Sequence, residues 1–182
     1  KSFDGIIVID EAYIDFCNIE FSFINELNNF NNIILLRTFS KAWGLAGLRL
    51  GYALASKEII NILLNVKLPY NISALVSNLF FKVIDKEEIK RKNIDLIISE
   101  RNRLYKELTK IKEVTKVYPT DANYILFQAD RHIELFNYLI ANGIVIRDRS
   151  SQIINSLRVS IGTIEENNTF LLNLRKFYET SN

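Results

Sequence analysis

Two short, uninterrupted apolar runs constrain the fold of this chain more than any other feature. Residues 6–9 (IIVI) end at Asp10 and Glu11, and residues 33–36 (IILL) end at Arg37. A run that is apolar on both faces is typical of a strand in a parallel sheet, because helices cover both sides of such a sheet. The carboxyl ends of parallel strands meet at one edge, where α/β proteins bind their ligands. We therefore predict an α/β fold with a site at that edge.

The rest of the chain has the patterns of further strands and helices. Residues 48–55 are expected to form a third strand, and Ser56 and Ser73 are expected to cap two helices. Residues 21–30 form either a short helix or a surface loop. Over residues 86–112, apolar side chains recur at helical spacing between lysines and glutamates, which predicts a long connecting helix with a solvated face. After it we expect strands at residues 114–118, 122–127, 144–147 and 157–161, a helix at residues 133–141, and a last helix that opens with a capping box of Thr163 and Glu166.

Composition and charge exclude several classes of function. The 182 residues include 23 lysines and arginines against 21 aspartates and glutamates, so neither nucleic acid nor an anionic membrane is indicated as a partner. One cysteine, Cys17, and one histidine, His132, cannot form a cysteine zinc site or a pair of histidine ligands, and we expect no metal. No apolar run reaches the ~18 residues of a membrane span. We expect a cytoplasmic protein.

Groups of five chemical types follow the first two predicted strands. Asp10 and Tyr13 come just after the first strand, Ser40 and Lys41 just after the second, and Arg49 eight residues later. A site for pyridoxal 5′-phosphate (PLP) needs these types. A carboxylate keeps the ring nitrogen protonated, a donor binds the ring hydroxyl, a lysine binds the aldehyde, and a cation with hydroxyls binds the phosphate.

The sequence around these groups resembles a known family. Residues 8–13 (VIDEAY) and 37–52 (RTFSKAWGLAGLRLGY) are similar to two signature stretches of the fold-type I aminotransferases, and most similar to those of the histidinol-phosphate aminotransferase branch. Residues 121–126, 143–148 and 157–163 have counterparts in the same order. These five ordered motifs extend the resemblance over nearly the whole chain.

The resemblance implies a role for each matching residue of the first two motifs. Lys41 would hold the cofactor and carry a proton between it and the substrate. Asp10 would pair with the ring nitrogen, and Tyr13 would hydrogen-bond the ring hydroxyl. Ser40 and Arg49 would hold the phosphate.

The later motifs are implied to bind substrate. Arg158 would bind its anionic end, because a planar guanidinium suits a carboxylate or a phosphate. Arg147 and Asn123 are candidates for the same pocket, with a structural role equally open for both.

The resemblance also implies how the chain is organised. Residues 1–85 would be the C-terminal part of a PLP-binding large domain, residues 86–112 the connecting helix, and residues 113–182 a small C-terminal α+β domain. Because the chain contains no methionine and starts almost directly with an apolar run, we expect it to be the C-terminal half of a longer protein. The family's N-terminal half supplies further cofactor contacts, so we expect the chain alone not to be catalytically competent.

The implied function is transamination between glutamate or 2-oxoglutarate and a second small molecule. Histidinol phosphate is the leading candidate, which would place the protein in histidine biosynthesis. Family members are homodimers, so we expect a homodimer. Two alternatives stay open. One is a threonine-phosphate-type PLP decarboxylase, which shares the fold and an arginine-lined pocket. The other is a binding or assembly module that keeps the fold without the cofactor, although the intact set of site residues argues against it.

Overall fold

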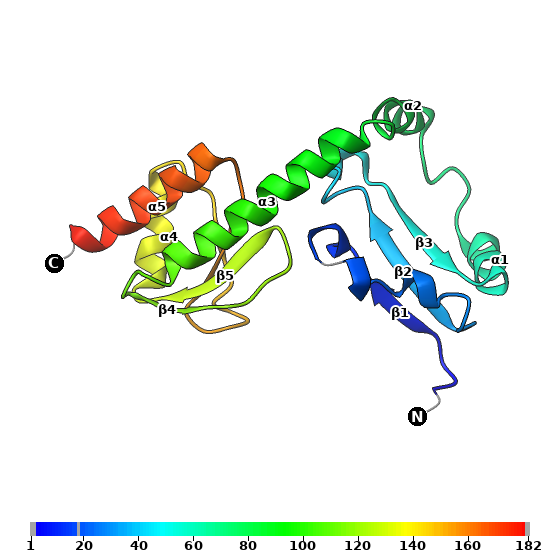
Figure 1. Ribbon diagram of the computed structural model, residues 1–182, viewed down its shortest axis with the longest axis horizontal. Coiled ribbons are helices and arrows are strands. Elements are labelled where there is room, and N and C mark those ends of the chain that lie inside the picture. The colour runs from blue at the N-terminus through cyan, green and yellow to red at the C-terminus, as the bar shows by residue number, and fades with distance from the viewer. Residues whose placement is uncertain (1–2, 18, 181–182) are drawn as a thin grey trace. The chain divides into compact units, whose positions relative to one another are not determined.

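The structure, a computed structural model, describes residues 3–17 and 19–180. It confirms the α/β class and divides into two compact units, residues 1–93 (unit 1) and 94–182 (unit 2), each with its own sheet (Figure 1). The boundary falls inside the long helix α3 (Glu87–Leu108), which lies within the range expected for a connecting helix. The assignment of the flanking segments to a cofactor-binding large domain and a small domain stays a prediction.

Unit 1 is built on a three-stranded sheet in the order β1-β2-β3. As expected, β1 (Ile7–Asp10) runs parallel to β2 (Ile33–Thr38), whereas β3 (Gly51–Ala55) runs antiparallel to β2. Val8 of β1 is 56% exposed, so the full burial expected for this strand is not seen. Between β1 and β2 the chain forms short 3₁₀ turns rather than an α-helix.

The third strand begins later than the sequence predicted. Residues 46–48 form a 3₁₀ turn, and Arg49 after it is left-handed, with a φ of 52°. The alternation of Leu48, Arg49 and Leu50 resembles a strand, but the chain must reverse direction here so that β3 can run antiparallel to β2. This reversal uses the residues that were expected to start the strand.

The two helices after β3 begin where their capping serines predicted. The side chain of Ser56 accepts a hydrogen bond from the backbone N–H of Ile59 at the start of α1 (Lys57–Val66). Ser73 caps α2 (Ala74–Val83) in the same way. Both caps satisfy a backbone donor that the first helical turn leaves without a partner.

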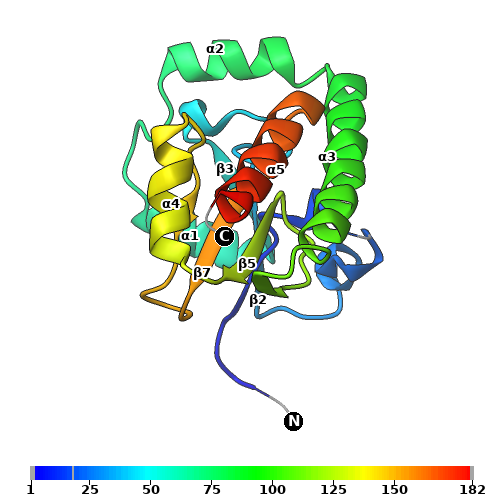
Figure 2. The same cartoon turned by 90° about the vertical axis from the view of Figure 1, so that its left-hand side faces the viewer.

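Unit 2 has a four-stranded antiparallel sheet in the order β4-β5-β7-β6. Figure 2 shows α4 (His132–Ala141) and α5 (Ile164–Glu179) beside this sheet. Alternate residues of the central strands are buried in a core beneath the helices, which explains the alternating apolar pattern. The strands are β4 (Val114–Val117), β5 (Tyr124–Ala129), β6 (Arg147–Asp148) and β7 (Ser156–Ser160).

In unit 2, β4 and β6 are shorter than predicted, β5 begins and ends two residues later than predicted, and one helix start is confirmed. Residues 144–146 lie outside β6, because the backbone N–H of Ile144 donates to Leu139 as the chain leaves α4 through Gly143, whose φ is 76°. The capping box of α5 is present. Thr163 Oγ1 accepts the N–H of Glu166 at 3.2 Å, and Glu166 accepts the N–H of Thr163 at 2.8 Å.

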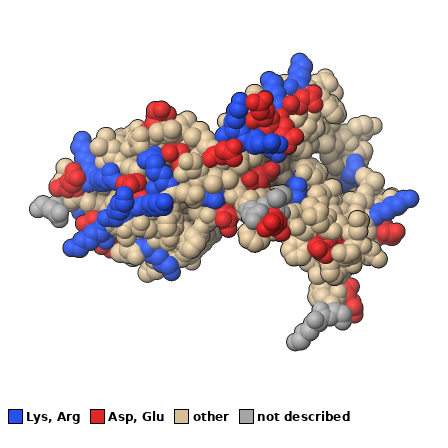
Figure 3. All heavy atoms as spheres, viewed as in Figure 1, with Lys and Arg blue, Asp and Glu red and all other residues tan. Residues whose placement is uncertain are grey.

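Side chains of both signs gather over the N-terminal half of α3 (Figure 3), as expected for a solvated helix face. Lys92 and Glu88, one turn apart, approach to 2.7 Å. Among the described residues, the structure contains no helix that is both long and apolar enough to cross a membrane.

Candidate functional site

The carboxyl ends of β1 and β2 open onto a pocket of about 300 Å³ in unit 1. Four of the residues that the sequence named as cofactor ligands line it, namely Asp10, Ser40, Lys41 and Arg49. The fifth, Tyr13, lies beside them, because Nζ of Lys41 is 5.1 Å from the centre of its ring. The structure therefore brings together an amine, a carboxylate, a phenol, a hydroxyl and a guanidinium.

Local structure fixes Asp10, the last residue of β1, and Tyr13, which follows the strand. Oδ1 of Asp10 accepts the backbone N–H of Ala12 at 2.9 Å, which orients the carboxylate at the end of the strand. Tyr13 precedes a 3₁₀ turn whose Ile14 and Phe16 side chains are buried. This buried anchor holds the phenol beside the pocket.

A tight turn presents Lys41 after β2. The backbone N–H of Ser40 donates to Oγ1 of Thr38 at 3.0 Å, and the N–H of Gly44 donates to the carbonyl oxygen of Lys41 at 2.9 Å. Gly44 has a φ of 66°, a conformation that glycine adopts at little cost. Ala42, beside the lysine, is buried and anchors the turn.

Arg49 reaches the same pocket from a strained backbone. Its φ of 52° and ψ of 39° are left-handed, and such a conformation costs a residue other than glycine about 1 kcal/mol or more. Its Nη1 donates to the carbonyl oxygen of Ala46 at 3.2 Å, while the side chain stays exposed. A strained, solvent-accessible cation is suited to bind an anion such as a phosphate.

The sequence reasoning missed a buried polar cluster next to this pocket. Glu11 is 7% exposed, and its carboxylate accepts hydrogen bonds from Arg37 at 2.8 and 3.0 Å and from the Ser22 hydroxyl. A signal for the pair was available. Glu11 lies two positions after the first apolar run and Arg37 directly follows the second, and the two strands were expected to be parallel neighbours.

The candidate substrate residues lie in unit 2. Arg147 of β6 and Arg158 of β7 are directly opposite each other in the antiparallel register. The guanidinium of Arg158 lies 4.8 Å from the ring centre of Tyr124, and its buried Nε finds no hydrogen-bond partner in the described part of the chain. The carbonyl oxygen of Asn123 accepts the N–H of Ile161 at 2.9 Å, which is a structural contact, and a role of its side chain stays a prediction.

Two like charges directly across a strand pair destabilise a sheet unless an anion lies between them. Residues opposite one another in an antiparallel pair point to the same face, so both guanidinium groups extend from the face that carries Tyr124 rather than from the buried core face. Their arrangement is suited to bind a carboxylate or a phosphate.

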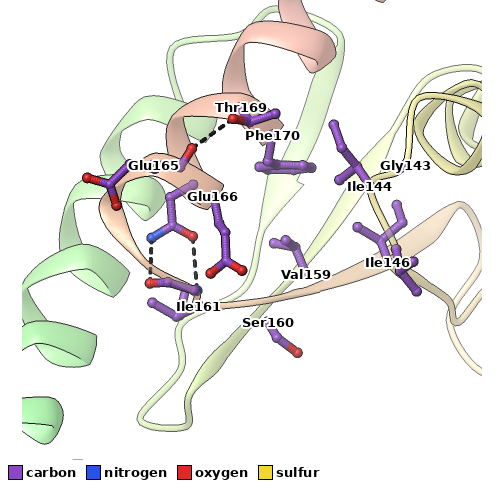
Figure 4. Close-up of a pocket in the computed structure, with 13 residues that line it drawn as sticks. Gly143, Ile144, Ile146, Val159, Ser160, Ile161, Glu165, Glu166, Thr169 and Phe170 are labelled. Atoms are coloured by element: carbon purple, nitrogen blue, oxygen red, sulfur yellow. Dashed lines mark hydrogen bonds between the residues drawn. The ribbon is translucent and has the colours of Figure 1, made fainter.

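A second hollow of about 510 Å³ lies elsewhere in unit 2 (Figure 4). Apolar side chains form much of its wall, including those of Ile144, Val159 and Phe170. The polar side chain of Asn167 at its edge is already engaged, because its amide both donates to and accepts from the backbone of Gly162. This hollow contains none of the predicted site residues.

No group of three His, Cys, Asp or Glu side chains converges as metal ligands anywhere in residues 3–17 and 19–180.

Comparison with known proteins identifies the family of the chain. The protein-family model described as Aminotransferase class I and II matches residues 1–174. The chain belongs to this family. Enzymes of the family use PLP, so the expected family, its cofactor and the expected fold class are all confirmed.

Curated relatives carry a more specific name. The chain is 44% identical over 173 residues to a histidinol-phosphate aminotransferase of Parabacteroides distasonis, a match that covers 94% of this chain and 50% of the relative. It is also 44% identical over 165 residues to the enzyme of the same name from Buchnera aphidicola, covering 88% of this chain and 46% of the relative. The chain thus spans about half the length of the curated relatives it matches.

Solved structures give the same fold. A histidinol-phosphate aminotransferase from Clostridium acetobutylicum matches with a TM-score of 0.87 at 26% identity, over 96% of this chain and 55% of that one. A decarboxylase from Sulfurospirillum multivorans matches with a TM-score of 0.82 at 27% identity, over 95% of this chain and 52% of that one. The fold is therefore shared by enzymes of both kinds.

Proposed function

We propose that this chain provides the lysine, the ring-nitrogen carboxylate and a substrate anion site of a PLP-dependent aminotransferase that acts on histidinol phosphate. Glutamate and 2-oxoglutarate would be the other donor and acceptor pair. The observation that carries the proposal is the convergence of Asp10, Ser40, Lys41 and Arg49 on one pocket, with Tyr13 beside Lys41. The relatives named histidinol-phosphate aminotransferase support the choice of substrate.

The residues of this pocket fit PLP in type and number. Asp10 would hold the proton on the ring nitrogen, and Tyr13 would hydrogen-bond the ring hydroxyl. Lys41 would bind the aldehyde carbon, while Ser40 and Arg49 would bind the phosphate. Each polar feature of the cofactor thus has a complementary group in the pocket, and when bound PLP supplies an electron sink for the reacting carbon of the substrate.

Lys41 would act as the acid and base of the reaction. Its amine would take the proton from the reacting carbon of the amino donor. In the second half of the reaction it would give a proton to the reacting carbon of the amino acceptor. The Tyr13 ring beside Nζ holds the lysine side chain in place. The carboxylate of Asp10, oriented by the N–H of Ala12, keeps its position during this transfer.

Arg158 and Arg147 would bind the anionic end of the substrate. The buried Nε of Arg158 and the like-charge pair across β6 and β7 support this role, because both features are costly in the absence of an anion. Histidinol phosphate carries such an anion, and so does glutamate.

The setting of the enzyme is part of the same proposal. We propose a cytoplasmic homodimer in histidine biosynthesis, on the basis of the family resemblance and the named relatives. Gel filtration with light scattering tests the dimer, and a mass of one protomer would contradict it.

The decisive assay measures amino transfer by the natural protein that carries this sequence. With PLP, histidinol phosphate and 2-oxoglutarate, we expect glutamate to form. Lys41→Ala should lower kcat by about 10³-fold or more, because it removes the acid and base. Lys116→Ala, a basic residue on β4 that contacts the Tyr118 ring, is the control and should keep wild-type activity. An unchanged rate in Lys41→Ala would contradict the proposal.

The likeness to a decarboxylase structure gives a second candidate function. Carbon dioxide released from threonine phosphate without formation of glutamate would favour a decarboxylase. Neither reaction, together with no visible absorbance from bound PLP, would favour a binding module that keeps the fold.

A further inference from the structure

The ion pair of Glu11 and Arg37 lies at the carboxyl ends of β1 and β2, close in sequence to the cofactor residues Asp10 and Lys41. Glu11 directly follows Asp10, and Arg37 lies four residues before Lys41. The register pairs Asp10 with Leu36, and the backbone N–H of Glu11 donates to the carbonyl oxygen of Leu36 at 2.8 Å. The ion pair therefore joins the two strands at the level where each one passes into the segment that carries a cofactor residue.

The cluster is tightly connected. Oε2 of Glu11 accepts from Nε of Arg37 at 3.0 Å and from Nη2 at 2.8 Å, and the same Nη2 donates to the Ser22 hydroxyl at 2.8 Å. Oε1 accepts the backbone N–H of Phe23 at 2.8 Å. With donors on both oxygens, the Glu11 carboxylate has little freedom to move, and the planar guanidinium is held at the same time.

Stability alone does not account for a buried pair of this kind. Removing two charges from water costs about as much free energy as their attraction returns. Well-packed apolar residues would therefore stabilise the two strand ends equally well. What an ion pair with fixed hydrogen bonds adds is a defined geometry. Arg37 also lines the pocket that contains Asp10 and Lys41, while its guanidinium is turned toward Glu11.

Arg37 is positively charged in the folded protein. Burial lowers the pKa of Arg37, but hydrogen bonds to Glu11 and Tyr52 outweigh this effect, and the net pKa is raised. Arg37 therefore stays protonated wherever the protein is folded.

We propose that Glu11 and Arg37 are a positioning pair that sets the separation between the Asp10 carboxylate and the Lys41 amine. The inference rests on the proposed function, since it assigns the pair to the cofactor site. It acts through the strand ends: a shift of one strand along the other would move the carboxylate and the amine relative to each other. Neither Glu11 nor Arg37 needs to touch the cofactor.

The test compares two ion pairs in the natural protein, each of which contains a buried carboxylate. Arg37→Met breaks the pair at the site, and Arg103→Met breaks the pair with Glu100, a buried carboxylate in unit 2. Three quantities are measured: the Tm of the PLP-free protein, the Kd for PLP by absorbance, and the pH midpoint of the visible band of bound PLP.

Both variants should lower Tm. Only Arg37→Met should raise the Kd for PLP, on the order of tenfold, by analogy with residues that orient metal ligands through hydrogen bonds. Only Arg37→Met should shift the pH midpoint, by about half a unit or more, because Asp10 and Lys41 control the protonation of the bound cofactor. Arg37→Lys, which keeps the charge without the planar fork, should fall between Arg37→Met and wild type in both readouts.

Three results would overturn the proposal. One is a folded Arg37→Met protein with wild-type Kd and pH midpoint, and another is an equal shift in Arg103→Met. If Arg37→Met does not fold, Glu11→Asp takes its place, because it keeps the charge and shortens the side chain by one methylene. A Glu11→Asp protein with the wild-type Kd and pH midpoint would then overturn the proposal. The third is a wild-type protein that gives no PLP band, which would remove the proposed function itself and this inference with it.

Discussion

Arg147 and Arg158 lie directly opposite each other on the antiparallel strands β6 and β7. A like-charge pair in this position destabilises a sheet by about 0.2–1 kcal/mol. The pair is therefore expected to have a binding role, and its cost should be visible in the absence of an anion.

The first prediction concerns this arginine pair. In the PLP-free protein without phosphate, Arg147→Leu should be as stable as wild type or more stable, because the repulsion is removed. Inorganic phosphate should raise the Tm of wild type and have a smaller effect on Arg147→Leu and Arg158→Leu. Thermal unfolding followed by circular dichroism measures all three proteins. Lys116→Leu is the matched control, since Lys116 also lies over a tyrosine ring in the same sheet, and its response to phosphate should match wild type. An equal response in all variants would argue against an anion site.

The second prediction separates backbone strain from charge at Arg49. Arg49→Gly and Arg49→Ala both remove the guanidinium, and both should weaken PLP binding. Only glycine relieves the left-handed backbone, so Arg49→Gly should be about 1 kcal/mol more stable than Arg49→Ala. Urea unfolding of the PLP-free variants gives this difference. If alanine were as stable as glycine, the strain at this position would be refuted.

The third prediction concerns pH and Glu100 of α3. Its carboxylate accepts from Arg103 at 2.6 and 2.8 Å and from the Asn167 amide at 2.9 Å. The hydrogen bond from Arg103 lowers the pKa of Glu100, although burial opposes this. Because the pKa is lower in the folded state, the carboxylate stabilises the protein above its ordinary pKa, and this contribution is lost as pH falls through the lowered value.

The measurement is Tm against pH for wild type and Glu100→Gln. Below about pH 4.3, the ordinary value for a glutamate, wild type should lose stability more steeply than the glutamine variant. Parallel curves would show that this ionisation does not contribute to stability.

The fourth prediction uses Trp43, the single tryptophan of the sequence, two residues after Lys41. Nζ of Lys90 lies 4.8 Å from the Trp43 ring centre and 3.3 Å from Oδ1 of Asp15. Lys90→Met should lower stability by about 0.5–1 kcal/mol and shift the emission of Trp43, because it removes a cation from the ring face. Fluorescence during urea unfolding gives both values. Lys92→Met, on the same helix and largely exposed, should change neither; a Lys90→Met protein with unchanged emission would contradict the contact.

Local signals in the sequence predicted much of this fold. Ser56, Ser73 and Thr163 each cap a helix where expected, because a capping side chain and its backbone partner are separated by only two or three residues. The two apolar runs likewise predicted β1 and β2 and their parallel arrangement.

Features that depend on strand register could not be predicted from local sequence signals. Arg147 and Arg158 are 11 positions apart, and the sequence does not state which residues of two antiparallel strands face each other. For Glu11 and Arg37, the ends of the two apolar runs indicate proximity but not the hydrogen bonds between the side chains. The left-handed Arg49 was missed because alternating apolar and polar residues occur in turns as well as in strands. The clustering of Asp10 with Ser40 and Lys41 was predictable, since the carboxyl ends of two parallel strands meet at one edge of the sheet.

Borohydride reduction is the measurement that shows whether Lys41 is the residue that holds the cofactor. The natural protein is incubated with PLP, reduced, digested and mapped by mass spectrometry, with Lys41→Arg treated in parallel. We expect one dominant pyridoxyl label, on Lys41, and its loss in the variant. A label spread over surface lysines, or one that persists in Lys41→Arg on another residue, would contradict the assignment.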